Sequence, residues 1–164
     1  MALVASTAVR RATVQSTERD ALALRQRFER ALGPVDWSPP GLAPGAILLV
    51  RRLAVAAGGA GVAESFAQRT SRELQRTAAA ARRPWIHEDA ASAPAVVFAD
   101  EAELVAGLAR DWRLGFVARR WWWPAVLRGM PPGEWIRREV LPSGMQVPAV
   151  MRLLAARGEA VAFA

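Results

Sequence analysis

The chain has a single histidine, His87, and two carboxylates follow it directly, Glu88 and Asp89. A histidine beside carboxylates has the groups needed for proton transfer or for an oxygen-rich metal site. Neighbours in a loop need not converge, however, and no second histidine and no cysteine are present to complete a transition-metal shell. Any serine triad would also depend on this one histidine. We therefore expect a solvated loop histidine and predict no catalytic residues and no metal ligands.

A glycine-rich turn, Gly58-Gly59-Ala60-Gly61, separates a predicted strand from a predicted helix. At such a junction backbone N–H groups can approach a phosphate. The spacing matches neither standard nucleotide-binding fingerprint, because Glu64 stands where a third glycine would be needed and no Gly-Lys-Ser/Thr follows. We expect a simple turn and no bound cofactor.

Four arginines recur along one side of the helix predicted over 62–82 and just beyond it: Arg69, Arg72, Arg76 and Arg83. Such a row can grip successive phosphates, with an affinity that falls as salt rises. The alternative is a solvated helix face that Glu64 and Glu73 partly neutralise. Both interpretations remain open, and the row is a candidate polyanion-binding site.

Three tryptophans stand in a row, Trp121, Trp122 and Trp123, directly after Arg119 and Arg120. Successive helical side chains are about 100° apart, so these indoles would spread over about 200°, wider than the apolar stripe of an ordinary surface helix. One small core should not cover all three rings. We expect a companion surface to shelter them, with Trp122 the most exposed.

The predicted partner-binding surface therefore consists of arginines and tryptophans between residues 110 and 128: Arg110, Trp112, Arg113, Arg119, Arg120, Trp121, Trp122, Trp123 and Arg128. Three interpretations are open for it. The rings could form the core of a helical region, they could stack on unpaired bases between arginines, or they could form a protein interface, where tryptophan and arginine are common hot spots. Protein contact is the interpretation that we prefer over base stacking.

The formal net charge is +7, and all 22 basic residues are arginine while lysine, asparagine and tyrosine are absent. Codons of the missing residues are AT-rich, so the arginine excess partly reflects a GC-rich genome and is weak support for a nucleic-acid partner. Zero cysteines exclude disulfides and thiolate metal sites. The first residues lack the order of a secretory signal, and no apolar run approaches the ~20 residues of a membrane-spanning helix. We expect a cytoplasmic protein with no membrane span.

The fold class that these patterns predict is α+β: a small two- or three-stranded sheet covered by two amphipathic helices, followed by a helical C-terminal half. A capping box at Thr17 and Asp20 and another at Asp100 and Glu103 mark two helix starts. The expected strands are 8–15, 46–55 and 95–99, and the expected helices are 18–32, 62–82, 100–114, 116–128, 133–141 and 147–157. Residues 1–99 would form the strand-helix part and 100–164 the Trp/Arg-rich half of one compact unit.

Two segments, 9–14 and 50–55, match at four of six positions as Val-Arg-Arg-x-x-Val. Each precedes an amphipathic helix, which would suit a duplicated strand-helix unit. Chance similarity in a chain rich in valine and arginine is the alternative.

The order of segments resembles the N-terminal region of tape-measure-type proteins of bacterial contractile injection systems. The resemblance covers residues 8 to 123: an arginine-bearing strand at 9–14, a helix containing Leu-Arg-Gln-Arg-Phe at 24–28, a second strand at 48–53, the long helix at 62–82 and the tryptophan cluster. It implies a structural, non-enzymatic component of a tail-like assembly. Even as one unbroken helix the chain would span only about 250 Å, so it is no long ruler itself.

We therefore expect a non-catalytic structural or adaptor protein that docks to a larger bacterial assembly, such as a contractile phage-tail-like particle, through the Trp/Arg surface. The alternative is a nucleic-acid-binding module that uses the arginine rows and tryptophan stacking. Self-association is compatible with either, and so is release of the chain as part of a particle.

Overall fold

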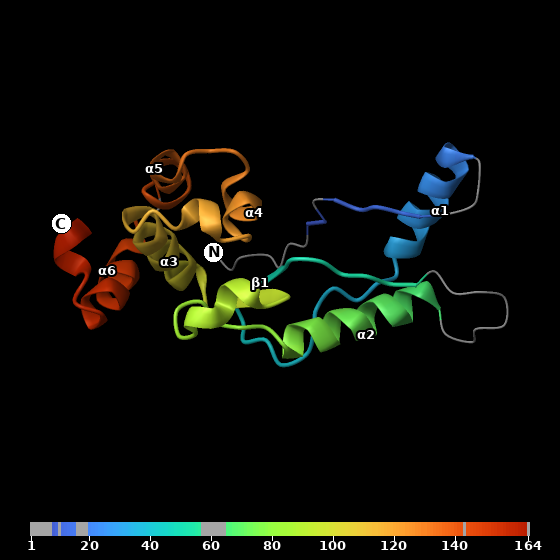
Figure 1. The fold of residues 1–164 in the computed structure, drawn as a ribbon, viewed down its shortest axis with the longest axis horizontal. Coiled ribbons are helices and arrows are strands. Elements are labelled where there is room, and N and C mark those ends of the chain that lie inside the picture. Colours follow the sequence, from blue (N-terminus) through green and yellow to red (C-terminus); the bar gives the residue numbers. More distant parts are fainter. Residues whose placement is uncertain (1–7, 10, 16–19, 57–64, 143, 164) are drawn as a thin grey trace.

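The computed structural model describes residues 8–9, 11–15, 20–56, 65–142 and 144–163. In chain order the elements are α1 (Ala21–Leu32), β1 (Ile47–Val50), α2 (Phe66–Ala79), the 3-10 turn η1 (Glu88–Ser92), β2 (Ala95–Phe98), α3 (Glu101–Arg113), the 3-10 turn η2 (Val117–Arg119), α4 (Trp123–Leu127), α5 (Pro132–Trp135), the π-helical turn η3 (Ile136–Val140), α6 (Val147–Ala156) and the 3-10 turn η4 (Ala160–Phe163). The molecule is elongated, with α3 to α6 gathered at one end, α1 at the other, and α2 and the sheet between them (Figure 1). The predicted α+β class and the helical C-terminal half are confirmed.

The sheet consists of β1 and β2, which pair antiparallel with Ile47 opposite Phe98 and Val50 opposite Ala95. On the other side of β2, Arg82 adds one parallel bridge to Val96. The ladder stops after the N–H of Arg51 donates to the carbonyl of Pro94 at 2.9 Å, because proline has no N–H to return a bond. The strand predicted over 46–55 is therefore shorter than expected.

The strand predicted over 8–15 is wrong for the residues that the structure describes there. Residues 8–9 and 11–15 lie in no strand, and Val9 and Val14 remain 53% and 39% exposed. Because Arg10 and Arg11 are consecutive, a strand here would carry one arginine on each face, and neither face would be wholly apolar. Of the 50–55 segment only Val50 lies in β1, and none of the described residues of the 9–14 segment lies in a strand, so the structure gives no support to a duplicated unit.

The caps explain where α1 and α2 begin. The Asp20 carboxylate accepts the N–H groups of Leu22 and Ala23, both at 3.0 Å, so Asp20 is itself the cap. Thr17, the predicted cap, lies outside the described residues. At α2 the Ser65 hydroxyl accepts the Gln68 N–H while the Gln68 side chain accepts the Ser65 N–H, a complete capping box.

Only α2 of the two N-terminal helices packs against both strands. α1 instead lies against α2, where the rings of Phe28 and Phe66 meet edge to face with centroids 6.0 Å apart. The prediction that both helices cover the sheet is thus half right. The apolar stripe of α1 is narrow, and one neighbouring helix suffices to half-bury it.

The main core lies where the sheet meets the helical half. Phe98 and Val96 from β2 pack with Leu104 and Leu108 from α3. A second cluster joins α3 to α6 through side chains that include Val105 and Leu154. The predicted start of α3 is confirmed, since the Asp100 carboxylate accepts the Glu103 N–H at 2.8 Å.

The N-terminal part, in contrast, has almost no core. Among the described residues between 20 and 79, the buried apolar side chains are Val35, Pro39 and Leu74, and α1 has no buried residue at all. Nearly all other core side chains come from residues 90 to 154. The two ends of this elongated molecule therefore differ sharply in how much apolar surface they remove from water.

Candidate interaction surfaces

Two of the three adjacent tryptophans are enclosed by the protein's own fold. Trp122 and Trp123 are 0% exposed, and Trp121 is half-buried. Trp123 packs on Phe98, with ring centroids 5.8 Å apart, and touches α3 at Gly107. Trp122 meets both neighbouring indoles edge to face, at 5.5 and 6.0 Å. The prediction that this domain cannot shelter the rings, with Trp122 the most exposed, is wrong for these two.

The reason is that the segment is not one continuous helix. η2 ends at Arg119, Arg120 is extended with φ −104° and ψ 114°, and α4 begins only at Trp123. The backbone break turns the rings toward one core, so the angular argument from a regular helix does not apply. Pro124, in the first turn of α4, fits its start, since a first-turn proline has no helical N–H bond to lose.

A buried carboxylate, Asp111, anchors the cluster. Its Oδ2 accepts the indole N–H of Trp123 at 2.7 Å and lies 3.7 Å from Nε of Arg120. Burial raises the pKa of Asp111, and the Trp123 hydrogen bond and the charges of Arg120 and Arg110 only partly oppose this. Sequence reasoning missed Asp111, although a lone carboxylate three residues after Leu108 on the apolar stripe of α3 was a usable signal.

Beside this anchor, three buried N–H groups have no hydrogen-bond partner within the described structure: Nε of Arg120 and the indole nitrogens of Trp121 and Trp122. A cavity of about 20 Å³ lies here, lined by residues that include His87, Asp111, Arg120 and Trp122. Arg120 also lies over the Trp122 ring, 5.6 Å from its centroid. The predicted partner residues Trp122 and Trp123 are therefore internal, and Arg120, whose side chain is 22% exposed, packs against them.

Two further predicted partner residues are engaged by a carboxylate far along the chain. Nε of Arg110 and Nη2 of Arg113 donate to the two oxygens of Glu159, at 3.0 and 3.1 Å. Burial alone would raise the pKa of Glu159, but the two arginines outweigh it and the pKa is lowered. This fork ties the segment after α6 to the end of α3.

The predicted surface therefore shrinks to an exposed remainder. Trp112 is 50% exposed and Leu114 38% exposed. Arg119 and Arg128 also face solvent, and Arg119 lies over the ring of Phe116 at 5.7 Å. The Trp112 ring covers Gly133 of α5 so closely that a Cβ built there would stand 2.7 Å from it. Trp112 is thus the one indole between residues 112 and 123 that packs closely against a neighbouring helix and is also widely exposed.

The arginine row of α2 does not form a single phosphate-binding face. Arg83 forks onto Glu103 of α3, with Nε 2.9 and 2.8 Å from the two carboxylate oxygens, and Nη2 closes the pair. Glu103 is 1% exposed, so the carboxylate of this ion pair is buried, while the Arg83 side chain remains 37% exposed. Sequence reasoning assigned Glu103 to a capping box and missed this partner, which lies 20 residues from Arg83.

The other members of the row are also engaged. Arg76 pairs with Glu73 at 2.8 Å, and Nε of Arg69 donates to the carbonyl of Ala56 at 3.1 Å. Arg72 is exposed. Of these contacts, the Arg69 bond ties α2 to the segment after β1, and the Arg76 pair lies within the helix itself.

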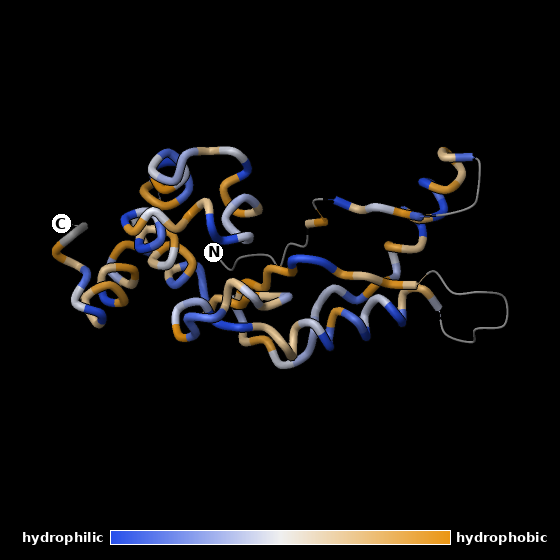
Figure 2. The backbone as a smooth tube through the Cα atoms, in the orientation of Figure 1, coloured by the Kyte–Doolittle hydropathy of each residue, from blue (hydrophilic) through white to orange (hydrophobic). Residues whose placement is uncertain are grey.

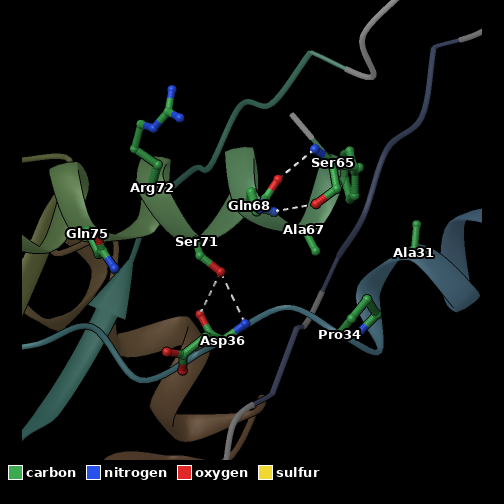
Figure 3. Close-up of a pocket in the computed structure, with 10 residues that line it drawn as sticks. Ala31, Pro34, Asp36, Ser65, Ala67, Gln68, Ser71, Arg72 and Gln75 are labelled. Atoms are coloured by element: carbon green, nitrogen blue, oxygen red, sulfur yellow. Dashed lines mark hydrogen bonds between the residues drawn. The ribbon is translucent and has the colours of Figure 1, made fainter. Parts of the chain in front are cut away.

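An open groove of about 1120 Å³ runs between α1 and the start of α2. Figure 3 shows its floor, where Ser71 of α2 accepts the N–H of Asp36 at 3.1 Å and donates to the Asp36 carbonyl at 3.2 Å. Phe66 and Ala31 line it from the two helices. The groove is wide and open, in keeping with the sparse core of this part.

His87 takes a structural position. Its Nδ1 lies 3.2 Å from the backbone N and 3.2 Å from the carbonyl oxygen of Arg83, at the start of η1. Glu88 and Asp89 are exposed. Within the described ranges, no group of three or more His, Asp or Glu side chains could hold a metal ion.

Comparison with known proteins gives no relative: no family model, no curated protein and no solved structure matches the chain. Of the helices that the structure describes, none has both the length and the apolar character that crossing a bilayer requires.

Proposed function

We propose that the protein is a non-catalytic structural or adaptor component, made in the cytoplasm, that docks to a larger bacterial assembly by protein contact. The observation that carries this proposal is the sparse core of the N-terminal part, where only Val35, Pro39 and Leu74 are buried apolar side chains among the described residues between 20 and 79. A segment with so little internal apolar burial gains stability when a partner covers it, as obligate interfaces do. An assembly component has such a partner.

The exposed remainder of the Trp/Arg segment supports a second contact, at the opposite end of the molecule (Figure 1). Trp112 and Leu114 expose apolar surface there, with Arg119 and Arg128 also facing solvent. Tryptophan and arginine dominate the energetics of many protein interfaces. Trp122 and Trp123 are no longer part of the proposed surface, because they are fully buried.

A photo-cross-linking residue in place of Trp112 tests the docking surface in the bacterium that makes the protein. We expect a covalent adduct with a protein of the assembly, and no adduct from the same residue at Arg152, an exposed position on α6. Equal labelling from both positions, or none from position 112, would contradict the proposal for this surface.

The finer proposal is that the assembly is a contractile phage-tail-like particle, which the order of segments over residues 8 to 123 supports. Particles sedimented from the producing bacterium should contain the chain in a fixed ratio to their structural proteins. Particles that lack it at every stage of formation would refute this finer assignment and leave the adaptor proposal standing.

Titration with single-stranded DNA or RNA at two salt concentrations tests the alternative function, a nucleic-acid-binding module. An adaptor should bind them weakly at 0.2 M salt. A nucleic-acid module with six to ten phosphate contacts should bind tightly and lose about 10³ to 10⁵ in affinity between 50 and 200 mM salt.

A further inference from the structure

In the part of the chain that the structure describes, the register of the sheet leaves one edge of β1 unpaired. Arg51 donates toward β2, so the alternation of an antiparallel ladder turns the N–H and C=O groups of Ile47 and Leu49 toward β2 as well. The same groups of Leu48 and Val50 then point away from β2. Within the described part of the chain no hydrogen bond engages them.

Two of the features by which proteins protect an edge strand, a charged side chain and a proline, are missing from β1 itself. β1 reads Ile-Leu-Leu-Val, with no charge and no proline, and each of its residues is only half-buried. Open apolar edges readily accept another strand. The apolar sequence resumes at 53–56 and is interrupted only by Arg51 and Arg52. Figure 2 shows a hydrophilic stretch, coloured blue, directly after β1.

Those two arginines define the chemistry of the partner. Arg51 and Arg52 are exposed, and among the described residues neither guanidinium has an ion pair or hydrogen bond. They stand at the C-terminal end of the open edge. A strand added antiparallel, the more stable orientation, would start beside them, so carboxylates at its N-terminal end would meet both charges.

We infer that the outer edge of β1 is a strand-addition site for an extended apolar segment of a protein partner, preceded by two acidic residues. The inference rests on the proposed adaptor function and names the kind of partner segment it takes. Main-chain hydrogen bonds to Leu48 and Val50 supply affinity, and the carboxylates fix direction and register.

A second copy of this chain satisfies the edge less well. Antiparallel pairing of β1 with another β1 would place residues 46 and 47 of the copy beside the arginines, and no Asp or Glu occurs between residues 37 and 63. The four arginines of such a pair would find no carboxylate on the pairing strands. The charge pattern therefore favours a different protein that carries acidic residues.

The test uses the full chain and two acetylated hexapeptides, Asp-Glu-Val-Thr-Val-Thr and its matched form Lys-Lys-Val-Thr-Val-Thr. Amide hydrogen exchange followed by NMR reports the edge directly. Saturating acidic peptide should slow exchange at Leu48 and Val50, while Leu49 and Arg51, already bonded toward β2, change little. The lysine peptide should bind about tenfold or more weakly.

Two variants separate edge pairing from other contacts. Leu48→Pro removes an outward N–H and spares the bonds to β2, and it should abolish peptide binding with an unchanged circular dichroism spectrum. If this variant does not fold, Arg51→Glu/Arg52→Glu carries the test and should reverse the preference between the two peptides. The charge-matched control, Arg137→Glu/Arg152→Glu, changes exposed arginines of the helical half that lie outside both proposed contacts, and it should reverse nothing.

Each remaining outcome overturns the inference. Equal binding of both peptides, or protection that avoids Leu48 and Val50, would show that the edge is not the site. A dimer in sedimentation that Leu48→Pro dissociates would assign the edge to a second copy. Cross-linking at position 112 is independent of these results, so a failed edge leaves the adaptor proposal intact, and a failed cross-link leaves the edge to be judged by the peptides.

Discussion

Truncating one buried indole should destabilise the protein far more than truncating an exposed one. Trp122 is 0% exposed, and burying its ~150–250 Å² contributes about 4–6 kcal/mol by area, an upper bound. Truncations of buried tryptophan to alanine typically cost about 3–5 kcal/mol. The indole N–H of Trp122 has no hydrogen-bond partner among the described residues, so its removal relieves about 1 kcal/mol or more of desolvation penalty. We expect Trp122→Ala to lower the free energy of unfolding by about 3 kcal/mol.

Urea denaturation followed by circular dichroism measures this change, with Trp112→Ala as the matched control. The Trp112 side chain is half exposed, so its loss should cost under about 1 kcal/mol. In a thermal melt, the loss of about 3 kcal/mol expected for Trp122→Ala corresponds to a fall in Tm of roughly 6–12 °C for a chain of this size. The urea slope should stay unchanged, since both variants unfold from the same native fold.

The opposite order of stabilities would refute the packing derived for the cluster. If Trp122→Ala melted with the wild type while Trp112→Ala lost several kcal/mol, the buried and exposed indoles would have been interchanged. A Trp122→Phe variant checks the same point, because it keeps an apolar ring in the site and should recover part of the loss.

Arg83→Met leaves the buried Glu103 carboxylate without its cation, so it should lower the free energy of unfolding by about 2–4 kcal/mol. The loss is smaller than for a fully enclosed pair because the Arg83 side chain is 37% exposed. Arg76→Ala, which breaks an exposed pair, should stay within about 0.5 kcal/mol in the same urea assay. Asp111 has a raised pKa in the folded state, so its contribution to stability is greatest below the ordinary aspartate pKa and is lost as pH rises through the folded value. Urea midpoints measured from pH 3 upward should therefore change by different amounts in wild type and Asp111→Asn, with the wild type losing more as pH rises, and parallel curves would contradict the burial of this carboxyl.

Local signals predicted the elements where the signal itself forms the structure. Asp100 is confirmed as the cap of α3, and the strands at 47–50 and 95–98 fall inside their predicted ranges. The strand at 8–15 failed because propensity alone does not supply a pairing partner. β1 is shorter than predicted because its partner at Arg51 is Pro94, which precedes β2. Pro94 is more than 40 residues from β1 in the sequence, so the local pattern around β1 could not predict this end.

The candidate sites were harder to predict because distant residues decide them. Arg83 finds Glu103 20 residues away, and Arg110 finds Glu159 49 residues away. Only the fold brings those carboxylates to the arginines, so a count of cations overstates the surface available to a polyanion. The prediction that the tryptophan cluster is exposed was wrong for a related reason. Its burial depends on a break in the helical backbone at Arg120, and the pattern of apolar residues does not predict that break.

The fork of Arg110 and Arg113 on Glu159 matters for anyone who shortens the chain. A fragment ending with α6 at Ala156 discards the anion that neutralises the end of α3. Such a fragment should adhere to heparin or DNA through charges that the intact protein keeps occupied, and its retention on those resins would measure an artefact of truncation.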